Sequence, residues 1–399
     1  MLNHQSFIFL LIVLLIPLFL FVSTADSLAS PCICFISDRF GNDDLFLINE
    51  DGTNLTRLTT SEADEFNPVW SPNGNKILFL SKRGNFFNMD YDLWVINADG
   101  SDLTLVAQNI RTFGGEIPKW SPTGNKIVYV TDDKKRLKVF ELTTKTTTDL
   151  LAPDTVGEFP DWSPDGNKII AYLHNNSEPG IYLFNPDGSE QVRLIEQKGR
   201  YSKLAWAPDG SKFAFRYLKP ALSFFGKESG LYVVEQTGKK GKFLGKGNEF
   251  TWCPDSQTIA FLAQHDNTSN DKNTYYSAYI VNAEINNKKN KPQKLNNTTN
   301  YQSAPFWSPD GRKIAYQKKN IVYLRESGSS KLIKIKVPRH YGTTLSWSPD
   351  SQKIIVVGYP EQFNNNTDLF IFNYQDGLIY NLTNTEKTSE YTPVWAPAI

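Results

Sequence analysis

Five glutamates stand at one recurring place in the chain, three to five positions before a tryptophan. They are Glu65, Glu116, Glu158, Glu249 and Glu390. If the segments that carry them line one channel, their carboxylates ring its mouth and attract a cation, a basic peptide or an N-terminal amine. The structural alternative is that each carboxylate accepts hydrogen bonds from a neighbouring repeat. These five residues are the candidate partner-binding positions.

Other residues that could do chemistry are few. Beyond residue 29 the chain holds His174, His265 and His340, whose spacing fits no metal-ligand pattern. No Gly-x-Ser-x-Gly sequence occurs, so the nucleophile turn of many hydrolases is missing. We therefore expect no catalytic residue, no metal site and no cofactor.

The composition is that of a folded chain with balanced charge. Its 399 residues include 42 Lys and Arg against 42 Asp and Glu, and 40% of them are apolar. Balanced charge argues against a chain-wide basic field for nucleic acid, and this apolar content suffices for a sizeable core. We expect a monomer with no nucleic-acid partner.

The first residues resemble a secretory signal. Phe7 to Val22 is a run of sixteen apolar residues, shorter than the roughly 20 that a membrane-spanning helix needs. The small residues that follow predict cleavage after Ala25 or Ala29. We expect residues 1–29 to be a signal peptide and residues 30–399 to be a periplasmic or secreted domain. An uncleaved membrane anchor is the alternative.

The tryptophans mark one motif, Trp-Ser-Pro-Asp-Gly in its full form, that recurs eight times at intervals of 40 to 55 residues. Its copies begin at Trp70, Trp120, Trp162, Trp206, Trp252, Trp307, Trp347 and Trp395. This interval is typical of one four-stranded propeller blade.

Each part of the motif has a structural role. Ser-Pro-Asp-Gly is a tight-turn sequence in which Pro presets φ and Gly accepts a positive φ. A β-branched strand follows, as at 126–130, then a third strand, as at 180–185, an Asp-Gly hairpin and a short fourth strand. We assign the tryptophan to packing between blades, where it buries roughly 150–250 Å²; a ligand-stacking platform is the alternative.

The order of strand types predicts a closed ring. Each of the four types occurs eight times, yet the chain begins with a second strand at 33–37 and ends with a first strand at 393–395. A C-terminal strand that completes the first blade explains this offset and removes an exposed sheet edge. We expect an all-β, single, closed eight-bladed β-propeller. Seven blades are the alternative, because the copy at Trp252 has Cys253 for Ser and Ser256 for Gly.

The Pro-x-Trp-Ser-Pro-Asp-Gly-x-x-Ile unit, with its Asp-Gly hairpin, resembles the WD40-like β-propeller repeat of the TolB family. Similar repeats build tricorn-like and dipeptidyl peptidase IV-like propellers. The resemblance covers residues 33–397 and implies the fold more specifically than the function. TolB proteins are periplasmic and bind partner proteins, and they carry an α/β domain ahead of a six-bladed propeller. The peptidases add a Ser-nucleophile hydrolase domain, and this chain shows the pattern of neither extra domain.

Four long polar loops are expected on the face that carries the glutamates, at 82–90, 218–229, 264–276 and 359–367. Function commonly lies on loops that a rigid scaffold holds. We therefore expect a non-enzymatic extracytoplasmic protein that presents this loop face and the channel mouth to a protein or peptide, with a basic partner favoured by the carboxylates. The alternatives are a propeller enzyme, a lyase or hydrolase with its site in the channel mouth, and a propeller subunit of a separate catalytic chain.

Overall fold

The structure is a computed structural model that describes residues 32–82, 91–110, 117–131, 135–174, 178–197, 199–219, 229–264, 276–286, 291–295, 305–329, 331–338, 345–360 and 366–398. Several sequence-based expectations fall outside these ranges. They concern the signal segment 1–29, Glu116, His265, His340 and the central parts of the four long loops. Those expectations stay predictions.

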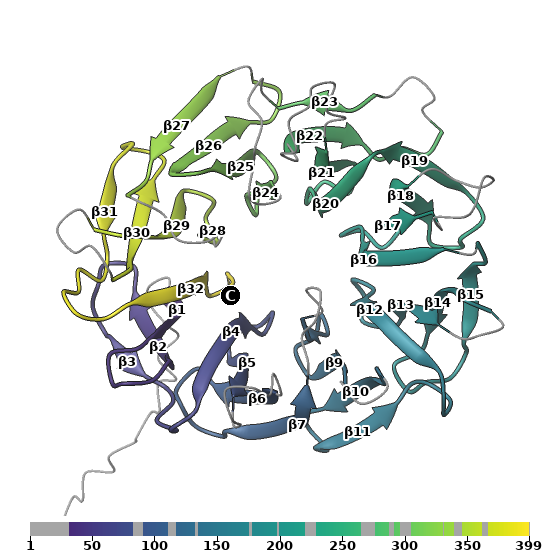
Figure 1. Ribbon diagram of the computed structural model, residues 1–399, viewed down its shortest axis with the longest axis horizontal. Coiled ribbons are helices and arrows are strands. Elements are labelled where there is room, and N and C mark those ends of the chain that lie inside the picture. The colour runs from purple at the N-terminus through teal and green to yellow at the C-terminus, as the bar shows by residue number, and fades with distance from the viewer. Residues whose placement is uncertain are drawn as a thin grey trace, which may run out of the picture. The chain divides into compact units, whose positions relative to one another are not determined.

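Eight four-stranded antiparallel sheets form a ring (Figure 1), which confirms the expected eight-bladed all-β propeller. We number the blades 1 to 8, starting with the one that holds β1. In that order the inner strands are β32 (Glu390–Trp395), β4 (Asp64–Trp70), β8 (Lys119–Trp120), β12 (Val156–Trp162), β16 (Arg200–Trp206), β20 (Gly247–Trp252), β24 (Phe306–Trp307) and β28 (Leu345–Trp347). The second strands are β1 (Cys32–Ser37), β5 (Lys76–Lys82), β9 (Lys126–Val130), β13 (Ile169–His174), β17 (Lys212–Leu218), β21 (Thr258–Gln264), β25 (Lys313–Lys318) and β29 (Lys353–Gly358).

The outer half of each blade is a second hairpin. The third strands are β2 (Asp44–Asn49), β6 (Tyr91–Asn97), β10 (Leu137–Glu141), β14 (Gly180–Phe184), β18 (Gly230–Glu235), β22 (Tyr276–Asn282), β26 (Ile321–Glu326) and β30 (Asp368–Asn373). The fourth strands are β3 (Thr56–Arg57), β7 (Thr104–Ile110), β11 (Thr146–Asp149), β15 (Val192–Ile195), β19 (Gly241–Gly245), β23 (Gln293–Lys294), β27 (Leu332–Lys336) and β31 (Ile379–Asn381). Within the described ranges there is no helix long and apolar enough to cross a membrane.

Blade 1 is built from segments at the two ends of the described chain. Its strand order is β3-β2-β1-β32. β32 pairs antiparallel with β1, so that Trp395 lies opposite Ile33 and Glu390 lies opposite Ser37. The C-terminal strand therefore completes the first blade, as the strand offset predicts.

The motif turns have the backbone that their sequence predicts. In blade 4, Gly166 has φ 72° and its N–H donates to Ser163 O at 2.8 Å. Asp165 Oδ1 accepts a hydrogen bond from Ser163 Oγ at 2.5 Å, which fixes the turn from within. Blades 6 and 8 place Ser256 and Ser351 at the glycine position, with φ 58° and 61°.

These two serines, whose φ is positive, also connect neighbouring turns. Ser256 Oγ accepts from the backbone N–H of Asp209 in blade 5 at 2.9 Å. Ser351 Oγ accepts from the backbone N–H of Asp310 in blade 7 at 3.0 Å. A glycine has no side chain for this contact, so the hydroxyl offsets the less favourable backbone.

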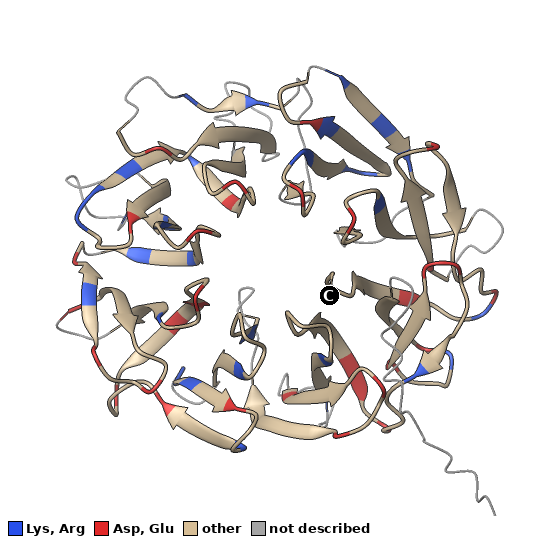
Figure 2. Cartoon of the chain, turned by 180° about the vertical axis from the view of Figure 1, so that it is seen from behind, with Lys and Arg blue, Asp and Glu red and all other residues tan. Residues whose placement is uncertain are grey.

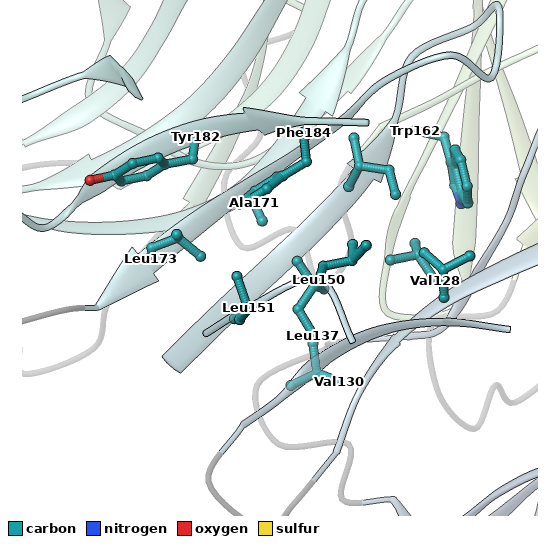
Figure 3. Packing of buried hydrophobic residues seen from close by; sticks show 12 residues of the cluster. Val128, Val130, Leu137, Leu150, Leu151, Trp162, Ala171, Leu173, Tyr182 and Phe184 are labelled. Atoms are coloured by element: carbon teal, nitrogen blue, oxygen red, sulfur yellow. The ribbon is translucent and has the colours of Figure 1, made fainter. Parts of the chain in front are cut away.

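The hydrophobic core lies between adjacent blades. One cluster joins Val128 and Leu137 of blade 3 to Trp162, Leu173 and Phe184 of blade 4. Figure 3 shows these side chains packed across the space between the two sheets. Each sheet thus buries its faces against its neighbours, as propeller blades must.

The motif tryptophans also bond to the preceding blade. In five blades the indole N–H donates to the carbonyl of the residue just before the preceding motif tryptophan, at 3.1–3.3 Å: Trp70 to Val394, Trp120 to Val69, Trp162 to Lys119, Trp252 to Ala205 and Trp347 to Phe306. The indole nitrogens of the other three motif tryptophans, Trp206, Trp307 and Trp395, are buried with no hydrogen-bond partner among the described residues.

A matched pair of variants tests these bonds. Trp120→Phe keeps an aromatic ring but leaves Val69 O without its donor, whereas Trp206→Phe removes an N–H that has no partner. We expect Trp120→Phe to destabilise the fold by about 1 kcal/mol more than Trp206→Phe. Equal losses of unfolding free energy in urea would show that the indole bonds contribute nothing.

A C-terminal truncation tests the closure. Deleting Thr392–Ile399 removes Val394 and Trp395, which pair with Cys34 and Ile33, and so leaves half of β1 without an inner partner. We expect a loss of at least the roughly 3–5 kcal/mol of a buried tryptophan truncation, together with self-association through the exposed edge. Melting temperature and gel filtration measure both, and deleting only the last two residues, which lie beyond β32, is the control. A monomeric truncation that melts like wild type would contradict the closed ring.

Candidate functional site

The inner strands separate two candidate regions at opposite ends of the ring's central opening. The four described glutamates lie at or near the start of these strands, and the motif tryptophan and its turn lie at their end. β4 has seven residues, which at about 3.3 Å per residue span roughly 20 Å. The carboxylates and the motif turns therefore occupy different faces of the propeller.

Glu65 is a buried bridge between blades 1 and 2, with only 1% of its surface exposed. Its carboxylate accepts from Ser61 Oγ at 2.8 Å, just beyond blade 1, and from Ser81 Oγ of β5 at 3.3 Å. Burial raises the pKa of Glu65 to about 7, and the nearby charge of Asp44 adds to the shift. Asp44 itself is fully buried and pairs with Arg57 at 2.5 Å.

Glu390 repeats this arrangement between blades 8 and 1. It is fully buried and pairs with Arg39 Nη2 of blade 1 at 2.8 Å. On the blade 8 side, Thr385 Oγ1 donates to it at 3.2 Å. Burial raises the pKa of Glu390 to about 7 against the opposing charge of Arg39, and Asp368 contributes to the rise. Both seams of the closing blade thus contain a buried glutamate.

The other two described glutamates have cationic partners. Glu158 contacts Lys135 of blade 3 and lies 3.2 Å from His174 Nε2. Burial alone would raise the pKa of Glu158, but hydrogen bonds from His174 and Lys135 outweigh it and lower the pKa to about 2. Glu249 is exposed and pairs with Lys203 Nζ at 2.5 Å.

The glutamates of the predicted ring therefore have different environments. Glu65 and Glu390 take the inter-blade acceptor role, while Glu249 is the described member whose side chain faces solvent. His174 contacts Glu158. Within the described ranges, no group of three or more His, Cys, Asp or Glu residues could hold a metal ion. Attraction of a partner by the carboxylates stays a prediction.

The raised pKa of Glu65 gives a prediction for pH. Its folded pKa of about 7 lies above the ordinary value of 4.5, so its contribution to stability is complete below pH 4.5 and is lost as pH rises through 7. Glu65→Gln mimics the protonated form. We expect the unfolding free energy of the variant, relative to wild type, to rise across this window by about 3 kcal/mol, at roughly 1.4 kcal/mol per pKa unit.

Urea unfolding between pH 4 and pH 8 measures this difference. Glu158→Gln is the control, because a pKa lowered to about 2 gives a contribution that is present above pH 4.5 and is lost only as pH falls through 2. Parallel pH profiles for wild type and Glu65→Gln would refute the assignment.

At the opposite end of the inner strands, the structure has an aromatic cavity of about 320 Å³. Blades 6, 7 and 8 supply its walls. Its lining residues are Thr251, Trp252, Pro254, Phe306, Trp307, Ser308, Pro309, Leu345, Ser346 and Trp347. We name this feature the aromatic cavity.

Two of its tryptophans differ from the rest of the repeat. The six motif tryptophans outside β20 and β24 are 5–9% exposed, whereas Trp252 and Trp307 are only partly buried. The indole nitrogen of Trp307 has no partner among the described residues. Packing between blades is thus incomplete here. The sequence gives one hint of this, since Phe306 puts an aromatic residue directly before a motif tryptophan.

Comparison with known families supports the repeat assignment. The family model described as TolB beta propeller domain matches residues 84–270. The TolB-like propeller repeat is confirmed. No curated protein matches the chain in sequence.

Solved structures share the fold of this TolB-like propeller. The dihydro-heme d1 dehydrogenase NirN has 12% identity and a TM-score of 0.61, with 90% of this chain and 75% of that chain covered. An oligogalacturonate lyase from Vibrio parahaemolyticus has 12% identity and a TM-score of 0.55, with 86% and 96% covered. The propeller domain of the Trilobed protease from Pyrococcus furiosus has 14% identity and a TM-score of 0.51, with 81% and 98% covered. At these identities the likeness concerns the fold alone.

Proposed function

We propose that this TolB-like propeller is a non-enzymatic binding protein outside the cytoplasm, periplasmic or secreted, and that it holds a protein or peptide partner. The observation that carries the proposal is the aromatic cavity. The apolar run at 7–22 supports the location.

The form of the cavity favours a peptide segment. Its 320 Å³ lies at the lower end of the roughly 300–1,000 Å³ of ligand sites, which suits one large side chain. Aromatic residues are enriched where proteins meet, because they supply a large contact area at low entropic cost. A rigid closed ring also spends little free energy on ordering itself when it binds.

The loop face is the other surface that the sequence predicts. It lies at the far end of the inner strands from the aromatic cavity, and most residues of its long loops are outside the described ranges. Phe40 marks this face, since it lies between β1 and β2 and is 61% exposed. Variants on the two faces can therefore separate the two binding modes.

Selection from a randomised heptapeptide library on the purified protein tests the proposal. We expect wild type and Phe40→Ala to enrich the same peptides and Trp307→Ala to lose them by about tenfold or more, as for a central interface tryptophan. Trp307→Leu keeps an apolar side chain and replaces the alanine variant if that variant melts early. Failure of wild type to enrich any peptide, or equal enrichment by the folded Trp307 variant, would refute binding at the cavity. Loss in Phe40→Ala alone would assign binding to the loop face.

A further inference from the structure

The motif turns carry an uneven distribution of charge around the ring. The third turn residue is Asn73 in blade 2 and Thr123 in blade 3. It is an exposed aspartate in five consecutive blades, 4 to 8: Asp165, Asp209, Asp255, Asp310 and Asp350. We name these five residues the acidic arc. Figure 2 shows acidic residues, in red, at turns along the inner edge of the ring.

Hydrogen bonds lower the pKa of three carboxylates of the acidic arc, Asp165, Asp255 and Asp310. At Asp255, burial would raise the pKa, but backbone hydrogen bonds from Gln257 and Thr258 outweigh it and lower the pKa. At Asp310, burial is likewise outweighed, by a hydrogen bond from Ser308 first and also by the charges of Lys313 and Arg312, so its pKa is lowered too. These three turns therefore present negative charge at neutral pH.

Nearby lysines compensate for this charge only in part. Lys168 pairs with Glu190 at 2.9 Å and Lys353 pairs with Glu50 at 2.6 Å, so both are engaged by carboxylates outside the arc. Lys313 is buried and lies 3.8 Å from Asp310. Asp255 makes no ion pair within the described ranges, and the three residues that follow it carry no charge.

The aromatic cavity lies beside the middle of this arc. Pro254 and Pro309 line the cavity, and Asp255 and Asp310 directly follow them in the chain. The tryptophan rings of the wall attract cations through their faces. Trp252 already has Lys212 Nζ at 5.9 Å from its ring, whereas Trp307 has no such cation among the described residues.

An aromatic wall with carboxylates at its rim favours a side chain that carries a positive charge at the end of an apolar stem. We propose that the aromatic cavity takes an arginine side chain of the partner peptide, with the guanidinium against Trp307 and its charge opposite Asp255 and Asp310. Arginine fits better than lysine because its planar guanidinium is weakly hydrated and stacks on aromatic rings. This inference rests on the proposed function and names the chemistry of the partner.

The heptapeptide selection gives the first test. We expect arginine to be enriched at one position of the selected peptides. Enriched peptides without arginine would overturn this inference while leaving the proposed function intact. Absence of any enriched peptide would instead refute the proposed function.

The best arginine peptide is then titrated by fluorescence anisotropy. Replacing its arginine by citrulline, which is neutral and of similar shape, should weaken binding about tenfold or more. Asp255→Asn with Asp310→Asn should weaken binding about fivefold and flatten the salt dependence. Asp165→Asn with Asp209→Asn is the matched control on blades 4 and 5, away from the cavity, and should change the affinity less than twofold.

Asparagine keeps the turn hydrogen bonds, so these variants should fold. Equal affinity for the citrulline peptide, or equal losses in the two double variants, would overturn the inference.

Discussion

Antiparallel pairing between β1 and β32 decides whether the eight blades form a ring or an open row. Each sheet covers its faces with the sheets on either side, so an open row would leave two faces and two edges exposed to water. The pairing of Ile33 with Trp395 converts that row into a structure with no first or last blade. The clusters of apolar side chains between blades can then continue around the ring.

The seams between blades use different chemistry at their two ends. At the motif turns, indole nitrogens bond to backbone carbonyls of the preceding blade. At the other end, Glu65 and Glu390 are buried among serine and threonine hydroxyls on either side of blade 1. A buried carboxyl with a raised pKa makes the closing blade sensitive to proton concentration, which the apolar seams are not.

Almost the whole fold could be predicted from the sequence, because each repeat contains its turn, its strands and its tryptophan in the same order. The environments of the glutamates could not be predicted in this way. Glu65 and Glu249 hold similar places in the repeat, yet one is buried among hydroxyls and the other is exposed beside Lys203. The aromatic cavity could not be predicted either, because Trp307 has the same motif as the buried motif tryptophans. The greater exposure of Trp252 and Trp307 depends on how blades 6, 7 and 8 pack against one another, which the repeat motif does not specify.

The serines at the glycine position of two turns divide this face of the ring into units. Ser256 ties the turn of blade 6 to blade 5, and Ser351 ties the turn of blade 8 to blade 7. Between blades 6 and 7 the corresponding position is Gly311, which has no hydroxyl, and its carbonyl instead accepts a weaker hydrogen bond from the Cys253 thiol at 3.6 Å. This joint, which borders the aromatic cavity, therefore lacks the hydroxyl bond that the joints on either side of it have, and we expect its turns to move more than theirs. The cavity thus has one wall that is tied less tightly than the walls beside it, and small differences in guest size can be absorbed there.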